Sequence, residues 1–160
     1  MMLLFTTAFA ASPSFRTQTL TALVEMFDDH SEIRFSGTTN GAETHKMSIL
    51  WMPDGYQIGL EEFDESRMII RADGENGENL DVAATAISKN RSYSFDTEGA
   101  NEESAMDQNN EAGVYQMKTE KGDKITVLWT DMEKGWIVRV TGYNISKEDM
   151  LRISESVEIR

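Results

Sequence analysis

The alternation of apolar and polar side chains predicts that most of this chain is built from strands. From Ser31 onward the apolar residues recur at every second position, which is the period of a half-buried strand. Short turn sequences separate the runs, and each contains a glycine, which accepts the backbone angles of a tight turn. These turns are Pro53-Asp54-Gly55, Glu75-Asn76-Gly77, Lys121-Gly122 and Lys134-Gly135. The pattern therefore predicts a curved, mostly antiparallel sheet of about seven to nine strands.

The hairpin near the C-terminus has a register that the burial of its side chains selects. A loop from Met132 to Gly135 pairs Asp131 with Trp136, Trp129 with Val138, Val127 with Val140, and Ile125 with Gly142. One face then carries only apolar side chains, namely Ile125, Val127, Trp129, Trp136, Val138 and Val140. A slip of one residue would exchange the two faces of a strand, so only this register keeps these side chains together. We therefore expect both tryptophans in the core.

Helical spacing is predicted at both ends of the chain. Residues 12–30 carry apolar side chains at helical intervals, and Ser12 or Ser14 can cap the start, which predicts an amphipathic helix. Near the C-terminus, Ser146 and Asp149 resemble a capping box, and this helix should end near Ser156 with the last residues extended. The predicted fold class is α+β, with an N-terminal helix and a C-terminal helix packed on the sheet.

Residues 1–11 are uncharged and apolar, and three interpretations of them remain open. A whole membrane helix needs about 20 apolar residues, so this segment would be the outer end of a truncated one. A degenerate signal peptide is the second, since Ala8-Phe9-Ala10 fits a cleavage site but no basic start precedes it. The third is an apolar extension of the next helix, packed on the core. The expected organisation is a membrane or signal segment at 1–11, a connecting helix at 12–30 and a single α+β domain at 31–160.

The charge of the chain narrows the classes of partner. Its 160 residues include 15 Lys and Arg and 28 Asp and Glu, which gives a formal net charge of −13. Clustered cations supply most of the affinity for nucleic-acid phosphates, so we expect no nucleic-acid binding. An anionic membrane surface would also repel this body. The sequence has no cysteine, which excludes disulfides, thiolate nucleophiles and most structural zinc sites.

Few residues have the chemistry of a catalytic site. The two histidines, His30 and His45, have no neighbouring partner set that indicates catalysis or metal binding, so we interpret both as exposed and structural. A glycosidase needs two carboxyl groups across a cleft. A run of neighbouring acids is more typical of a solvated turn, and that interpretation is favoured for Glu61, Glu62, Asp64 and Glu65.

Three further groups have both a functional and a structural interpretation. Calcium prefers oxygen ligands, but the EF-hand pattern fails at Glu78, and a hairpin turn is favoured for Asp73, Glu75, Asn79 and Asp81. Core packing is favoured over a sugar-stacking platform for the last two of Trp51, Trp129 and Trp136. Core filling is favoured over an adaptable apolar pocket for Met47, Met52, Met68, Met106, Met117, Met132 and Met150. We therefore predict no catalytic, cofactor-binding or metal-binding residues.

The order of several segments resembles that of a known family. They are "LWMPDGYQIGLEE", "RMIIRADGENGENLDV", "FDTEGA" and "AGVYQMKTEKGDKITVLWTDMEKGWIVRVTGYNISKEDMLRISESV". Together they make the chain similar to the domain of unknown function 4367, an ectodomain family of Gram-positive bacteria. The resemblance implies that the domain follows one transmembrane helix and that some members carry a cytoplasmic segment related to anti-sigma factors. It supplies no catalytic residues.

The expected function is a non-enzymatic sensory or interaction domain on the outer side of a Gram-positive membrane. It would bind a protein or cell-envelope ligand, be held by a single membrane helix, and have a link to anti-sigma regulation that the resemblance implies. Secretion is the alternative location. Two alternative functions stay open: a carrier or sensor of lipid or lipopeptide with an apolar cavity under the curved sheet, and an unrecognised hydrolase with converging titratable groups.

Overall fold

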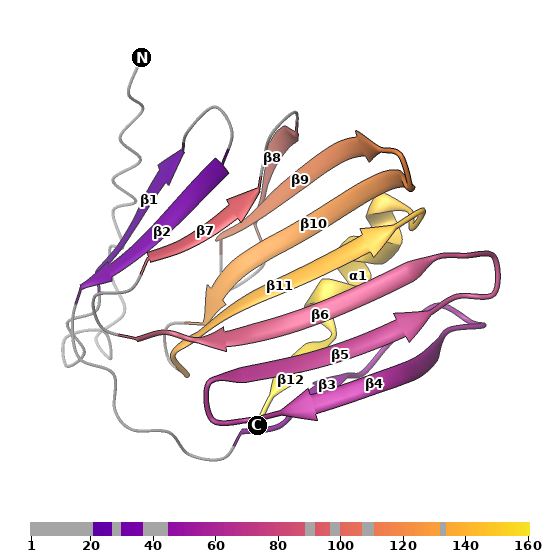
Figure 1. Cartoon of the computed structure of the whole chain (residues 1–160), viewed down its shortest axis with the longest axis horizontal. Helices are drawn as coiled ribbons and strands as arrows, with labels where there is room; N and C mark the ends of the chain where they lie inside the picture. The colour runs from indigo at the N-terminus through magenta and orange to yellow at the C-terminus, as the bar shows by residue number, and fades with distance from the viewer. Residues whose placement is uncertain are drawn as a thin grey trace. The chain divides into compact units, whose positions relative to one another are not determined.

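The computed structural model describes residues 21–26, 30–36, 45–88, 92–96, 100–106, 111–131 and 134–160. They belong to two compact units, residues 1–40 with 88–98 and residues 41–87 with 99–160. The first unit holds a three-stranded antiparallel sheet in the order β1-β2-β7 (Figure 1). Its strands are β1 (Thr21–Met26), β2 (His30–Ser36) and β7 (Ser92–Asp96).

The second unit is built on a seven-stranded sheet in the order β4-β5-β6-β11-β10-β9-β8 (Figure 1). Every pairing in this sheet is antiparallel among the residues described. Two meanders, β4-β5-β6 and β8-β9-β10-β11, meet where β6 pairs with β11. The strands are β4 (Gln57–Phe63), β5 (Arg67–Asp73), β6 (Asn79–Ala86), β8 (Asn101–Met106), β9 (Glu111–Thr119), β10 (Gly122–Asp131) and β11 (Trp136–Tyr143).

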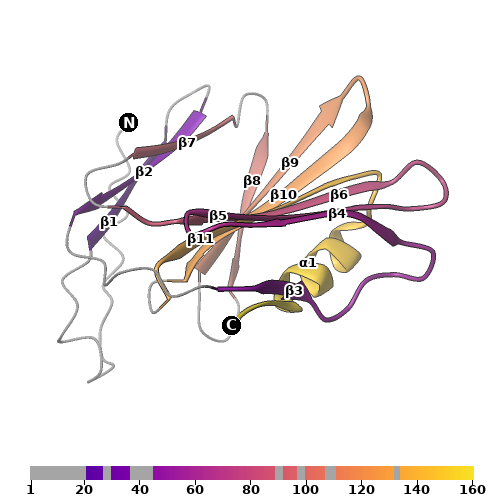
Figure 2. The same ribbon diagram turned by 60° about the horizontal axis from the view of Figure 1, so that its bottom comes forward.

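One helix and two short strands cover a single face of this sheet. Figure 2 shows α1 (Lys147–Glu155) and β3 (Met47–Ile49) on the same side of the seven strands. Strand β12 (Val157–Ile159) follows the helix and pairs with β3. The Ser146 Oγ caps the helix by accepting the Asp149 N–H at 3.1 Å, and it donates to the Asp149 carboxylate at 2.7 Å. The predicted capping residues, helix end and extended terminus are confirmed.

The core is a set of apolar rows that cross the strands at right angles. In the central row one residue from each of five neighbouring strands stands opposite the next, and each is at most 1% exposed. The row consists of Ile70, Val82, Val140, Val127 and Val114. Met150 and Ile153 of α1 pack against this surface and are fully buried. We call this side of the sheet the core face and the other side the second face.

The predicted register of the last hairpin is confirmed residue by residue. Strands β10 and β11 pair Trp129 with Val138 and Val127 with Val140, as the burial argument requires. Gly135 closes the loop with a φ of +75°, a backbone conformation that glycine adopts without strain. The prediction of a mostly antiparallel sheet with a C-terminal helix is therefore confirmed as well.

The predicted helix over 12–30 is wrong where the structure describes it. Residues 21–26 form strand β1, which pairs with β2, and His30 begins β2 instead of ending a helix. The segment fits both periods, because alternate positions are apolar at Ala22, Val24 and Met26. Pairing with β2 then satisfies the backbone groups of β1 that point toward β2. Residues 1–20, including the segment at 1–11, lie outside the described residues.

A substitution at Gly142 tests how closely α1 approaches the sheet. A Cβ added there would overlap the Met150 sulfur and lie 2.8 Å from Ile145 Cδ1. We expect Gly142→Ala to lower the free energy of unfolding by about 1–3 kcal/mol, measured by urea denaturation. The control is Gly59→Ala, whose added Cβ would lie 3.9 Å from its nearest neighbour. Equal stabilities of the two variants would contradict this packing.

Candidate functional site

The second face of the seven-stranded sheet carries a row of polar side chains. Strand pairing places Arg71, Asp81, Thr141 and Thr126 opposite one another on β5, β6, β11 and β10. The Arg71 Nε donates a hydrogen bond to Asp81 Oδ2 at 2.7 Å. The two threonine hydroxyls share a hydrogen bond of 3.3 Å. Four adjacent strands thus hold this row in a fixed geometry.

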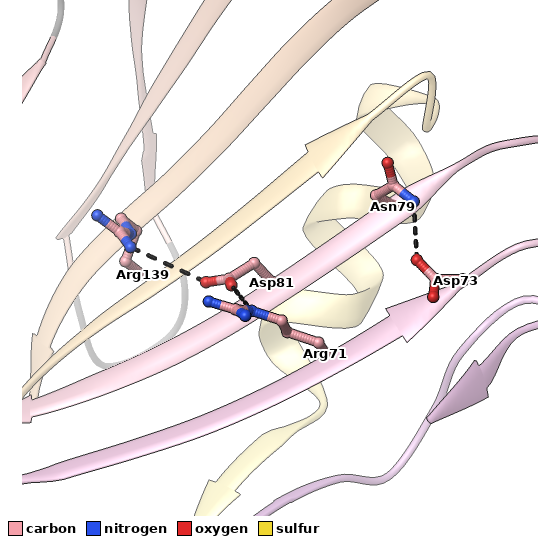
Figure 3. A network of polar contacts seen from close by, with 5 residues as sticks. All are labelled: Arg71, Asp73, Asn79, Asp81 and Arg139. Carbon is pink, nitrogen blue, oxygen red and sulfur yellow. Dashed lines mark hydrogen bonds and ion pairs between the residues drawn. The ribbon is translucent and has the colours of Figure 1, made fainter. Parts of the chain in front are cut away.

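A second arginine approaches the same aspartate from the neighbouring row. Arg139 lies on β11 two residues before Thr141, and its Nη2 is 3.9 Å from Asp81 Oδ1, too long for a hydrogen bond (Figure 3). Its Nε is buried and has no hydrogen-bond partner among the residues described. Figure 3 shows both arginines directed toward Asp81, which lies between them. We call Arg71, Asp81 and Arg139 the arginine–aspartate cluster.

The surroundings of Arg71 favour its charged form. The hydrogen bond from Arg71 to Asp81 raises the pKa of the guanidinium, and the charges of Asp81 and Glu62 add to the effect. The Arg71 side chain is 56% exposed and the Asp81 side chain 30% exposed, so solvent screens the pair. The cluster therefore offers guanidinium groups to the solvent and contributes little to stability.

The oxygen donors that were compared with a calcium site are divided between a hairpin turn and the cluster. At the end of the β5–β6 hairpin, Asp73 Oδ1 accepts a hydrogen bond from Asn79 Nδ2 at 2.8 Å (Figure 3). The Glu78 carboxylate accepts the Asn76 N–H at 2.8 Å, and backbone donors of this turn lower its pKa. Asp81 faces the arginines. No group of three or more His, Cys, Asp or Glu that could hold a metal ion occurs in the described part of the chain.

The run of acids from 61 to 65 lies at the edge of the sheet and in the turn that follows. Glu61 and Glu62 belong to the exposed edge strand β4. Asp64 Oδ1 accepts hydrogen bonds from the Ser66 N–H, the Ser66 hydroxyl and the Arg67 N–H at 2.7, 2.9 and 2.7 Å. These donors lower the pKa of Asp64. The arrangement is a hairpin turn closed by an aspartate side chain, in agreement with the favoured interpretation.

The aromatic candidates pack within the fold. Trp136 is 3% exposed, and the ring of His45 meets its ring edge-on at 5.6 Å. Trp129 is half-buried against the core, so the prediction of burial is met fully for only one of the two indoles. Arg152 lies 3.9 Å from the ring centroid of Trp51 in a cation–π contact. The side chain of His30 is outside the described residues.

The described methionines are buried or half-buried. Met47, Met68 and Met150 are buried in the core, and Met52 packs against it. Met117 is half-buried on β9. The side chain of Met106 and the whole of residue 132 are outside the described residues. The space under the sheet, where a lipid carrier would need a cavity, is filled by side chains from α1 and β3 among those described.

The patterns in the sequence do not single out the arginines of the cluster. Asp81 stood out only as an oxygen donor, although the hairpin centred on residue 76 already places it opposite Arg71. That pairing was available from the turn position and the period of two. The approach of Arg139 was not, because it depends on the pairing of β6 with β11, which are about 50 residues apart in the chain.

These features define a class of protein: an antiparallel-sheet domain whose core face is closed by a C-terminal helix and a terminal strand pair. The chain belongs to the family described as a domain of unknown function (DUF4367), whose profile matches residues 46–157. The match runs from the residue before β3 to the first residue of β12. No curated protein and no solved structure matches the chain. Among the described residues, none of the helical segments has the length and apolar character needed to cross a membrane.

Double-mutant cycles measure how the cluster is coupled. We expect a larger coupling energy between Arg71 and Asp81, which share a hydrogen bond, than between Arg139 and Asp81. Alanine variants, singly and in pairs, would be compared by urea denaturation at low ionic strength. A coupling of Arg139 to Asp81 equal to or larger than that of Arg71 would contradict this geometry.

The ionisation of Asp64 makes the stability of the fold depend on pH in a direction that its lowered pKa determines. Because its folded pKa is lowered, ionised Asp64 stabilises the fold above its unfolded pKa, and this stabilisation is lost as the pH falls through the folded pKa. We expect the wild type to exceed Asp64→Asn in stability at pH 6, and the difference to shrink below about pH 4. An NMR titration of Asp64 should also give a higher pKa in Ser66→Ala than in the wild type. A wild-type pKa at or above the ordinary aspartate value would refute this assignment.

Proposed function

We propose that this chain is a non-enzymatic sensory or interaction domain that works on the outer side of a Gram-positive bacterial membrane. The observation that carries the proposal is the difference between the two faces of the seven-stranded sheet. The core face is filled by α1 and the β3–β12 pair, while the second face carries charged side chains on neighbouring strands beside buried apolar ones such as Leu128 and Ile137. A rigid surface of this kind suits recognition of a partner.

The structural roles of the candidate residues support a binding function over a catalytic one. The acids near Asp64 close a turn, the oxygen donors near Asn79 close another, and Trp136 fills the core. A hydrolase needs titratable groups that converge on a substrate. The cluster of two arginines with one aspartate instead has the chemistry of recognition.

The backbone hydrogen bonds between the first and last residues of the domain support a sensory role. At Lys46 the chain enters the family domain, and its backbone N–H donates to the Arg160 carbonyl at 2.8 Å, while the Arg160 N–H donates back at 2.9 Å. Strand β3 follows directly and pairs with β12. The segment at which the chain enters the domain is therefore hydrogen-bonded to the last strand of the same domain. When a partner binds to the sheet, residues before 45 would transmit the change to a membrane tether.

Membrane attachment is tested by fractionating cells that produce the complete gene product. We expect the protein to stay in the membrane pellet after alkaline extraction and to be digested by protease added to intact protoplasts. A cytoplasmic enzyme and an integral membrane protein serve as controls for leakage and extraction. Release into the soluble fraction would contradict membrane anchoring, and release into the medium would favour the secreted alternative.

A further inference from the structure

We propose that Arg71 and Arg139 form a binding subsite for an oxyanion, the carboxylate or phosphate group of a ligand that docks on the second face. This inference names the ligand chemistry of the interaction domain proposed above and rests on that proposal. It concerns the arginine–aspartate cluster, whose members lie on the adjacent strands β5, β6 and β11.

The first argument is the number of hydrogen-bond donors that the cluster leaves unused. Each guanidinium has five N–H donors, and a single carboxylate stands between the two. Arg71 uses its Nε on Asp81, while Arg139 only reaches 3.9 Å from that carboxylate. The buried Arg139 Nε has no partner among the described residues. A buried donor without a partner is rare in folded proteins, and a bound ion or ordered water is a usual explanation.

The second argument is the convergence of the two guanidiniums. Both approach the same carboxylate, Arg71 at Oδ2 and Arg139 at Oδ1, so two guanidiniums flank one aspartate. Guanidinium groups bind carboxylate and phosphate through paired hydrogen bonds, with more geometric specificity than an ammonium provides. The Arg139 side chain is 41% exposed, which leaves it open to a ligand from solvent.

The third argument is the distribution of charge over the molecule. Among the described side chains that strand pairing places on the second face of β4, β5, β6, β10 and β11, four are basic and three acidic, a net charge of 4 − 3 = +1. They are Arg67, Arg71, Lys124 and Arg139 against Glu62, Asp73 and Asp81. The whole chain carries −13. On these five strands the second face is therefore not acidic, unlike the chain as a whole.

The experiment is an NMR titration of the full chain with inorganic phosphate and, separately, with acetate, at low ionic strength. We expect saturable shifts of the Arg71 and Arg139 side-chain Nε–H signals and of backbone amides near Asp81. Arg139→Gln should weaken the binding of the preferred anion at least about tenfold, the loss expected for one charge-assisted hydrogen bond. The arm with the tighter binding identifies the group as phosphate or carboxylate.

Two further variants make the test specific. Asp81→Asn removes the carboxylate that competes for the arginines, so it should tighten anion binding. Arg152→Gln changes the same charge on α1, where Arg152 stacks on Trp51, and should leave the affinity unchanged. Circular dichroism and thermal unfolding would verify that each variant is folded.

Three results would overturn the inference: no saturable shift with either anion, equal weakening in Arg152→Gln and Arg139→Gln, or weaker binding in Asp81→Asn. The outcome is independent of the fractionation experiment. If the protein binds the anion but is released by alkaline extraction, the proposed membrane anchoring is wrong and the subsite stands. If the protein stays in the membrane but binds no anion, the subsite is wrong.

Discussion

The unbroken apolar row across five strands is the interaction on which the rest of this structure depends. Its members come from two hairpin systems that are distant in the sequence, and the pairing of β6 with β11 brings them together. Each fully buried aliphatic side chain contributes about 1.5–3 kcal/mol relative to an exposed one. The row therefore joins the halves of the sheet, and α1 completes it by placing Met150 and Ile153 against it.

The position of the polar cluster follows from that row. Because side chains alternate along a strand, fixing Ile70 and Val82 on the core face fixes Arg71 and Asp81 on the second face. A slip of one residue would bury the arginine and expose the aliphatic side chains. The positions of Arg71 and Asp81 are thus set by the burial of their neighbours in the strands. The ion pair between them is largely solvated and does not need to supply the energy that fixes these positions.

The sequence predicted the features that depend on local patterns. The register of β10 with β11, the turn at Gly135 and the capped helix after Ser146 each follow from residues close together in the chain. Features that depend on distant partners could not be read in this way, since the choice of β11 as the neighbour of β6 has no local signal.

Strand β1 and the second face show the same limit. The segment at 21–26 fits both a helix and a strand, and its pairing with β2 decides between them. The second face of the last hairpin mixes polar and apolar side chains, and Leu128 and Ile137 on it are buried. The approach of Arg139 to Asp81 depends on the same distant pairing of β6 with β11, so it was also missed.

Amide hydrogen exchange measured residue by residue tests the central claim most directly. If the apolar row joins the sheet, the amides of β6, β10 and β11 that bond to neighbouring strands should exchange slowest, at a common rate set by global unfolding. The edge strand β4 should exchange much faster. Rapid exchange in β6 and β11, or separate rates for the two halves of the sheet, would contradict the account.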